Sequence, residues 1–177
     1  FDDGPHSTKT PVILNLLKRY NIQAIFFCIG RNVAENEQLV RRMAAEGHLV
    51  GNHSLAHSPW FDWYPSGKIF RELKMTDLAI QQATGAPARF FRPPFGVLNP
   101  MVSKALKRGA WITFCWDVRS LDTVLRDPEK IHRRILKNVS AGSVILLHDH
   151  TDYSLNHLEE LIKRLTDKGF TFTLPNL

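Results

Sequence analysis

Short apolar runs alternate with longer amphipathic segments along the whole chain. Residues 24–29 are continuously apolar, which is typical of a strand buried on both faces of a parallel sheet. By contrast, apolar residues between positions 10 and 20 recur at helical spacing. The pattern predicts strands at residues 24–29, 48–51, 90–91, 111–116, 143–147 and 170–174, after a first strand of which only the end is present. It predicts helices at residues 10–20, 32–46, 68–84, 101–107, 128–139 and 155–168.

Residues that flank these segments support the helix boundaries. Thr10 precedes Pro11, a combination typical of an N-cap and the first helical position. Asp127 is a plausible cap for the helix at 128–139. Gly47 and Gly169 follow two predicted helices, where glycine favours termination.

Strands that alternate with helices predict right-handed βαβ units and a parallel sheet. With roughly seven strands and no break in composition, we expect one α/β domain over residues 1–177, closed into a distorted barrel, with its N-terminal strand largely missing. The alternative is an open doubly wound sheet. No Gly-x-Gly-x-x-Gly or Walker loop follows a strand. Polar clusters instead follow several different strands, as expected at the rim of a barrel.

The composition is that of an ordinary globular protein of 177 residues, with 44% hydrophobic and 23% charged residues. The net charge of +6 is spread over amphipathic segments, and no nucleic-acid-binding motif accompanies it, so we expect a solvated basic surface and no nucleic-acid partner. The chain contains no run of 18 apolar residues, so we expect no membrane-spanning segment in it. We also expect a monomer. Cys28 and Cys115 lie inside predicted strands, which favours two buried free thiols over a disulfide.

Carboxylates and imidazoles gather where predicted strands end. Asp2 and Asp3 begin the chain, His53 and His57 follow residues 48–51, and His148 follows residues 143–147. One carboxylate with two imidazoles is a ligand set for a divalent metal ion with a position open for water. A second carboxylate and a third histidine could act as general base and general acid. The combination predicts metal-assisted hydrolysis.

Each of these features also has an ordinary explanation. Aspartates before Gly-Pro occur in turns, and an isolated histidine is more often a hydrogen-bonded core or surface residue. If the segment of His53 and His57 is helical, their i, i+4 spacing places both imidazoles on one face. Neighbouring side chains on a strand point to opposite faces, so Asp2 and Asp3 reach one site only if the strand turns there, which Gly4-Pro5 permits.

Five motifs follow one another in order. They are Asp2-Asp3-Gly4-Pro5, His53-Ser54-Leu55-Ala56-His57, Arg92-Pro93-Pro94-Phe95, a Trp/Asp segment at residues 116–122 and Leu146-Leu147-His148-Asp149. Together they resemble the polysaccharide deacetylase family, also called the NodB-homology domain or carbohydrate esterase family 4, and the resemblance covers the whole chain. It implies a distorted (β/α) barrel that removes acetyl groups from carbohydrates with a divalent metal ion, usually zinc.

The resemblance also implies a role for each matching residue. Asp3, His53 and His57 would be the metal ligands. Asp2 would be the general base, with Arg92 holding it ionised and oriented. His148 would be the general acid, its pKa raised by Asp122. The remaining expectations concern substrate: the N–H of Phe95 would stabilise the oxyanion, and Trp116 and Leu146 would line the pocket for the acetyl methyl group.

The fourth motif departs from the family pattern. Arg119 replaces an aspartate of that pattern, and Thr123 replaces a tryptophan that usually walls the groove. Trp60 and Trp63 follow the histidine pair and could stack on sugar in its place, or could pack the loop onto the barrel. We expect His150 to face water, with substrate contact as the alternative.

The resemblance favours an N-acetylated glycan as substrate, such as peptidoglycan, a chitin-like oligomer or a surface polysaccharide. Acetylated xylan, an O-acetyl ester, is a second possibility. A third is a non-catalytic carbohydrate-binding module on the same fold, although such a module would be expected to lack a ligand or the base. The family also favours an extracellular, periplasmic or cell-envelope location.

Overall fold

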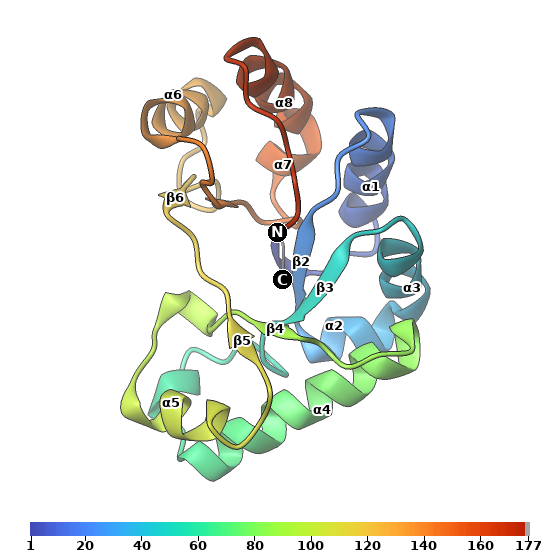
Figure 1. Cartoon of the computed structure of the whole chain (residues 1–177), viewed down its shortest axis with the longest axis vertical. Helices are drawn as coiled ribbons and strands as arrows, with labels where there is room; N and C mark the ends of the chain where they lie inside the picture. The colour runs from blue at the N-terminus through green and yellow to red at the C-terminus, as the bar shows by residue number, and fades with distance from the viewer. Residues whose placement is uncertain (176–177) are drawn as a thin grey trace.

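Short strands, all paired in parallel, form the inner layer of the computed structural model, which describes residues 1–175 (Figure 1). A five-stranded sheet has the order β1-β2-β3-β4-β5, and β6 and β7 form a separate pair. The strands are β1 (Asp2–Gly4), β2 (Ile25–Cys28), β3 (Leu49–Asn52), β4 (Phe90–Phe91), β5 (Ile112–Thr113), β6 (Val118–Arg119) and β7 (Ile145–Leu146). This arrangement confirms the predicted parallel α/β fold.

Helices surround the strands on the outside (Figure 1). They are α1 (Lys9–Arg19), α2 (Gly30–Glu35), α3 (Glu37–Ala45), α4 (Ser66–Thr84), α5 (Pro100–Leu106), α6 (Pro128–Asn138), α7 (Asp152–Asn156) and α8 (Leu158–Asp167), with 3-10 turns η1 (Phe61–Trp63) and η2 (Pro94–Gly96). In α4 the buried residues recur every three or four positions, as in Ile69, Leu73 and Ile80, because one stripe of the helix faces the core. No helix in the described part of the chain is long and apolar enough to cross a bilayer.

The two sheets meet at one edge and separate at the other. Between β1 and β7, Asp2 bridges to His148, and its N–H donates to the carbonyl of Leu147 at 2.9 Å. Between β5 and β6 no strand pairing occurs within residues 1–175. The side chain of Arg92, which follows β4, reaches the segment directly after β5. Its guanidinium donates to the carbonyls of Phe114 at 2.9 Å and Cys115 at 3.1 Å. The fold is therefore a distorted (β/α) barrel that is open between β5 and β6.

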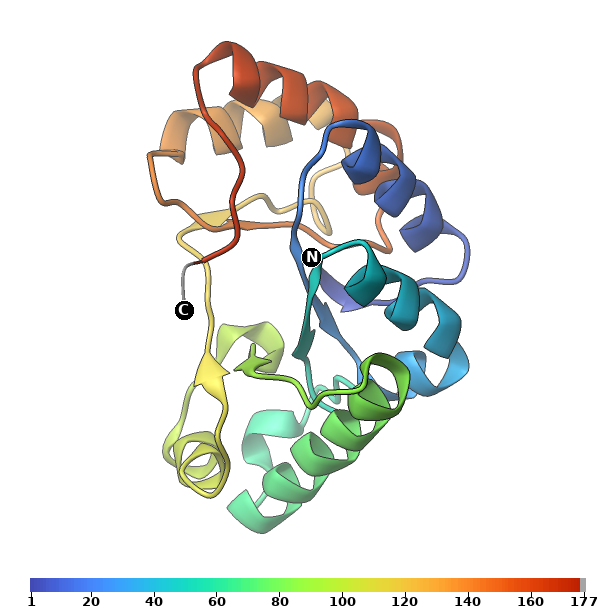
Figure 2. The ribbon, with the colours of Figure 1, turned by 45° about the vertical axis from the view of Figure 1, so that its right-hand side comes forward.

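Residues 170–174 do not form the predicted last strand. They leave α8 as plain coil (Figure 2) and line a cavity of about 530 Å³ with Ile25 and Val144, at the end of the strands opposite their carboxyl ends. Their alternation suits a strand, but they have no ladder partner in the described chain. Conversely, β6 was not predicted, because Val118 and Arg119 contain no apolar run.

Helix boundaries needed three corrections. The helix predicted at 32–46 is two helices, separated at Asn36, and that predicted at 155–168 is divided at His157. The first helix begins at Lys9, so Thr10 lies inside it and is not its N-cap. The hydroxyl of Thr10 instead donates a hydrogen bond to Asp149. The Asp127 cap is confirmed, because its carboxylate accepts from the N–H of Glu129.

Only one of the two cysteines is buried. Both are free, as expected, and Cys28 lies in the core. Cys115 is exposed because it lies beyond β5, where the sheet has no further neighbour.

Candidate active site

A bulge in β1 brings Asp2 and Asp3 to the same site. Asp2 pairs with Phe27 and Gly4 pairs with Cys28, so Asp3 is an extra residue between two ladder partners. Its φ of 72° breaks the alternation of side chains. The turn therefore lies at Asp3 itself, one residue before the Gly4-Pro5 turn that the sequence suggested.

Uncommon backbone conformations gather around this bulge. Among residues 1–175, positive φ angles occur at six residues that are not glycine, and all but Asn21 belong to the five motif segments: Asp3, Ser54, His57, Phe95 and Leu121. Such conformations cost roughly 1–3 kcal/mol each and persist where surrounding contacts impose them. Their concentration here makes this rim the candidate functional site of the fold.

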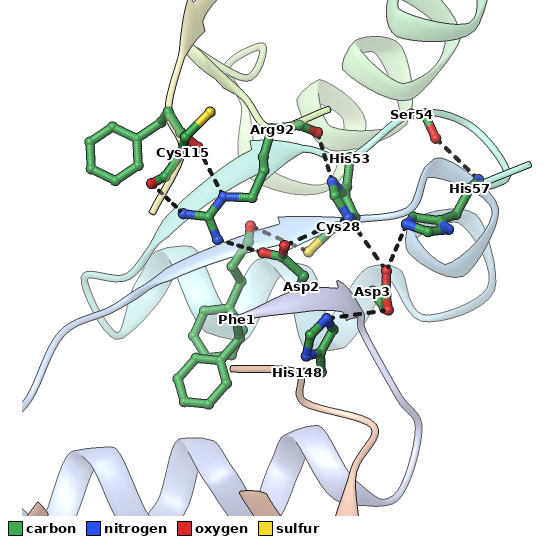
Figure 3. Close-up of polar contacts among 12 residues, drawn as sticks. Phe1, Asp2, Asp3, Cys28, His53, Ser54, His57, Arg92, Cys115 and His148 are labelled. Carbon is green, nitrogen blue, oxygen red and sulfur yellow. Dashed lines mark hydrogen bonds and ion pairs between the residues drawn. The ribbon is translucent and has the colours of Figure 1, made fainter. Parts of the chain in front are cut away.

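Asp3, His53 and His57 converge on one point, as Figure 3 shows. Their potential ligand atoms all lie within 4.8 Å of one another. The Oδ1 atom of Asp3 lies 3.4 Å from the Nε2 atoms of both histidines, yet it is buried without a hydrogen-bond partner in the described chain. A buried carboxylate oxygen that faces two imidazole nitrogens is what a divalent cation would satisfy, so the residues fit a metal ion.

The protonation states of these groups favour metal binding. The Nδ1 atom of His53 lies 2.7 Å from the carbonyl of Arg92, so it donates there and leaves Nε2 free as a ligand. Burial opposes ionisation of Asp3, but the imidazoles of His53 and His57 beside its carboxylate hold its pKa well below the ordinary value. Burial also lowers the pKa of His57, which favours the neutral ring that a metal requires.

A buried polar network fixes the loop that carries the two histidines. Asn52 accepts from the N–H of Ser54 at 3.0 Å and donates to Asp77 at 2.9 Å. Asp77 also accepts from the indole of Trp111, and the hydroxyl of Ser54 accepts from the N–H of His57 at 3.1 Å. The histidines thus converge through a hydrogen-bonded loop, not through the helix that their spacing suggested.

Asp2 stands beside this cluster as a separate carboxylate. It is buried, and one oxygen accepts from Arg92 at 2.6 Å. The other oxygen lies 3.8 Å from the Nε2 atom of His53 (Figure 3). Arg92 is also held by its hydrogen bonds to the segment after β5, which fix the guanidinium that orients Asp2.

His148 faces the same point from β7. Its Nδ1 atom lies 2.8 Å from Asp122, and its Nε2 atom lies 4.0 Å from the Oδ2 atom of Asp3. Burial alone would lower the pKa of His148, but the hydrogen bond and negative charge of Asp122 outweigh it, so the pKa is raised. Asp122 is itself held by donors from Ser120, Thr151 and the backbone of His148.

Aromatic and apolar residues form the edge of the site. The Phe95 ring packs edge-on against His57, with centroids 4.7 Å apart. Trp116 packs against the backbone of Gly96, where an added Cβ would meet its ring, and Leu146 is buried in β7 two residues before His148. Trp60 and Trp63 do not pack the loop onto the barrel, because 66% and 79% of their surfaces are exposed.

Several residues at the site were not expected from the sequence. Asn52 and Asp77 sit in ordinary strand and helix patterns, and only their long-range contacts reveal a role. Asp149 packs against Gly4, where any side chain would collide with its carboxylate, and burial raises the pKa of Asp149 to about 6. His150, expected to face water, turns its Nδ1 atom towards Asp3 at 3.7 Å.

Three known proteins are similar to this chain in sequence or in fold. The chain is 33% identical to the peptidoglycan-N-acetylglucosamine deacetylase PgdA of Listeria monocytogenes over 172 residues. The aligned region covers 97% of this chain but only 36% of the length of that protein. A family 4 carbohydrate esterase from Streptomyces lividans, solved with acetate, superposes with a TM-score of 0.91 at 30% identity and covers 99% of this chain and 90% of its own. A family 4 pseudoenzyme from Bacillus anthracis superposes with a TM-score of 0.89 at 28% identity, covering 97% of this chain and 60% of its own.

The family assignment rests on sequence as well as on structure. The family model described as polysaccharide deacetylase matches residues 1–110, which is more than half of the chain. The matched part includes the convergent residues Asp3, His53 and His57, together with Asp2 and Arg92. This chain therefore belongs to the polysaccharide deacetylase family.

Proposed function

We propose that this chain hydrolyses acetyl groups from an N-acetylated glycan, using a divalent metal ion, zinc, held by Asp3, His53 and His57. The observation that carries the proposal is the unpartnered, buried Oδ1 atom of Asp3 between two imidazoles, beside a second carboxylate and an acid–base histidine. The name of the Listeria relative specifies N-acetylglucosamine of peptidoglycan, which supports an N-acetyl substrate.

The residues of the site divide the reaction between them. A bound zinc ion would polarise the acetyl carbonyl and acidify the attacking water. Asp2, oriented by Arg92, takes the proton of that water as the carbon–oxygen bond forms. The backbone N–H of Phe95 donates to the oxyanion. His148, protonated because Asp122 raises its pKa, gives its proton to the amine nitrogen as the carbon–nitrogen bond breaks, which releases acetate.

Other residues of the rim select the substrate. Trp116 and Leu146 offer an apolar wall between Arg92 and β7 that suits the acetyl methyl group. Trp60 and Trp63 project into solvent beside the loop of His57, where their faces can stack on neighbouring sugars. The exposed indoles therefore favour an oligomeric or polymeric glycan over a single sugar.

A non-catalytic role is the principal rival, since a pseudoenzyme shares this fold. The chain keeps a complete set of candidate ligands, base and acid in contact with one another, which a purely binding module does not need. An O-acetyl ester such as acetylated xylan is the alternative substrate, because an alkoxide leaving group could accept the same proton.

Acetate release tests the proposal. The chain is incubated with N-acetylglucosamine oligomers, peptidoglycan and acetylated xylan, with a chelator and after restoring zinc. We expect acetate from the N-acetylated glycans, loss with the chelator and recovery with zinc. Zinc binding without acetate release from any glycan would support the non-catalytic module, and release from xylan alone would make the chain an esterase.

A further inference from the structure

His150 presents a polar atom that the proposed mechanism does not use. Its side chain is 40% exposed, yet the Nδ1 atom itself is buried and has no hydrogen-bond partner within residues 1–175. This atom faces the Oδ2 atom of Asp3 at 3.7 Å. A buried donor or acceptor without a partner is destabilising, so its position beside a charged carboxylate calls for an explanation.

The two oxygens of Asp3 have different surroundings. Oδ1 faces His53 and His57, whereas Oδ2 faces His148 and His150. Both oxygens belong to a side chain on a bulged residue with positive φ, where no strand neighbour fixes the carboxylate. A carboxylate with one free oxygen can rotate, and a rotated ligand would present the metal with a different atom.

We propose that His150 is a positioning residue for the metal ligand Asp3. In the tautomer that carries hydrogen on Nδ1, His150 donates to Oδ2 and so directs Oδ1 towards the metal. The separation exceeds a hydrogen bond by about 0.5 Å, which a small movement of the half-exposed side chain removes. The inference rests on the metal site of the proposed function, and hydrogen bonds to ligating groups typically change metal affinity by about 10- to 100-fold.

His148 cannot serve in place of His150. Its Nδ1 atom is occupied by Asp122, and its Nε2 atom must stay free to protonate the leaving group. The rings of His148 and His150 pack edge to face with centroids 5.7 Å apart, so they approach Oδ2 from adjacent directions. With His150 bound to Oδ2, the Nε2 proton of His148 is not drawn into a bond with Asp3.

Two substitutions separate the donor from the bulk of the ring. His150→Leu removes the donor, whereas His150→Asn retains an N–H at about the place of Nδ1. Zinc is titrated calorimetrically into metal-free samples of the wild type and both variants, without substrate. We expect zinc to bind about 10-fold more weakly to the leucine variant, and the asparagine variant to recover most of this loss.

Equal zinc affinity of the wild type and the leucine variant would overturn the proposal, as would equal weakening in both variants. Thermal unfolding of the metal-free proteins is the control, and we expect a single cooperative transition for all three, so that weaker zinc binding reports the ligand and not a loss of the fold. A wild type that binds zinc but releases no acetate would refute the proposed function and leave this inference standing.

Discussion

The two halves of the site differ in whether their hydrogen bonds are complete. At the end of the five-stranded sheet, the Oδ1 atom of Asp3 lies 3.4 Å from the Nε2 atoms of His53 and His57 and has no hydrogen-bond partner in the described chain. On the two-stranded sheet, both oxygens of Asp122 accept hydrogen bonds, from His148 among others. The first half requires a cation to complete it, and the second half is complete within the chain itself.

The difference teaches that metal binding and proton transfer can be changed separately. The halves come from different sheets and meet through Asp2, whose backbone pairs with β7 and whose carboxylate contacts Arg92 and approaches His53. Changes on one sheet should alter metal affinity, and changes on the other should alter the pH dependence of turnover.

The largest effect is expected from removing a ligand of the incomplete half. Asp3→Ala should reduce acetate release to background, because within residues 1–175 no other carboxylate lies within 4.0 Å of both imidazoles. Zinc at 100 times its Kd should stabilise the wild type by about 2.7 kcal/mol and the variant hardly at all. Thermal unfolding with and without zinc measures this, and an equal zinc-induced shift in both proteins would contradict the ligand assignment.

Asp2→Asn should separate binding from chemistry. The amide keeps an oxygen for Arg92 but cannot take a proton from water, so turnover should fall by about 10²- to 10⁴-fold. Its zinc affinity should match that of the wild type in calorimetry. Retained turnover would remove Asp2 from the role of base.

Asp122→Asn should act on the complete half alone. Without the negative charge, the pKa of His148 falls, and the acid loses its proton at a lower pH. The alkaline limb of the kcat/KM profile should therefore move to lower pH, with about a 10-fold loss of activity on that limb and little change in zinc affinity. An unmoved alkaline limb would show that another group limits the rate there.

Two substitutions in the buried network of Asn52, Asp77 and Trp111 test whether this network supports the metal site. Asp77→Ala removes the anchor of Asn52 and should weaken zinc binding by about 5-fold. Trp111→Phe removes the other donor to Asp77 and should lower stability by about 1 kcal/mol without changing zinc affinity. Equal zinc affinities in both variants would limit the role of Asp77 to stability.

The smallest effect is expected at the rim. Trp63→Ala should raise KM for a long glycan by about 3-fold, since one stacking contact is lost, and leave kcat unchanged. Leu78→Ala, on the exposed face of α4, is the matched control and should change neither constant. A fall in kcat would instead place Trp63 in contact with the reacting group.

The sequence predicted the parallel fold because its signals are local. The apolar run of β2, the Asp127 cap and the ends of α4 depend on neighbours within a few residues. The division at Asn36 and the missing strand at 170–174 depend on packing and on ladder partners elsewhere in the chain, which periodicity does not describe.

The candidate site also combines residues that the sequence predicted with features that it did not predict. Motif order named the residues that the structure brings together, such as Asp2, Asp3 and His53. It did not give the bulge at Asp3, because a strand register depends on both partners. It also missed Asp77, 25 residues from Asn52, because a single acid in a helix carries no signal of its distant contact.

Arg92 has a consequence for how such a site can be lost in evolution. Its carbonyl sets the tautomer of His53, one nitrogen holds Asp2, and two others donate to the carbonyls of Phe114 and Cys115 after β5. A substitution among the metal ligands would leave His148 and Asp122 intact, and a substitution of His148 or Asp122 would leave the metal ligands intact. A substitution of Arg92 would remove the counter-charge of the base and the two hydrogen bonds to the segment after β5 in one step, so we expect few substitutions to be tolerated at this position.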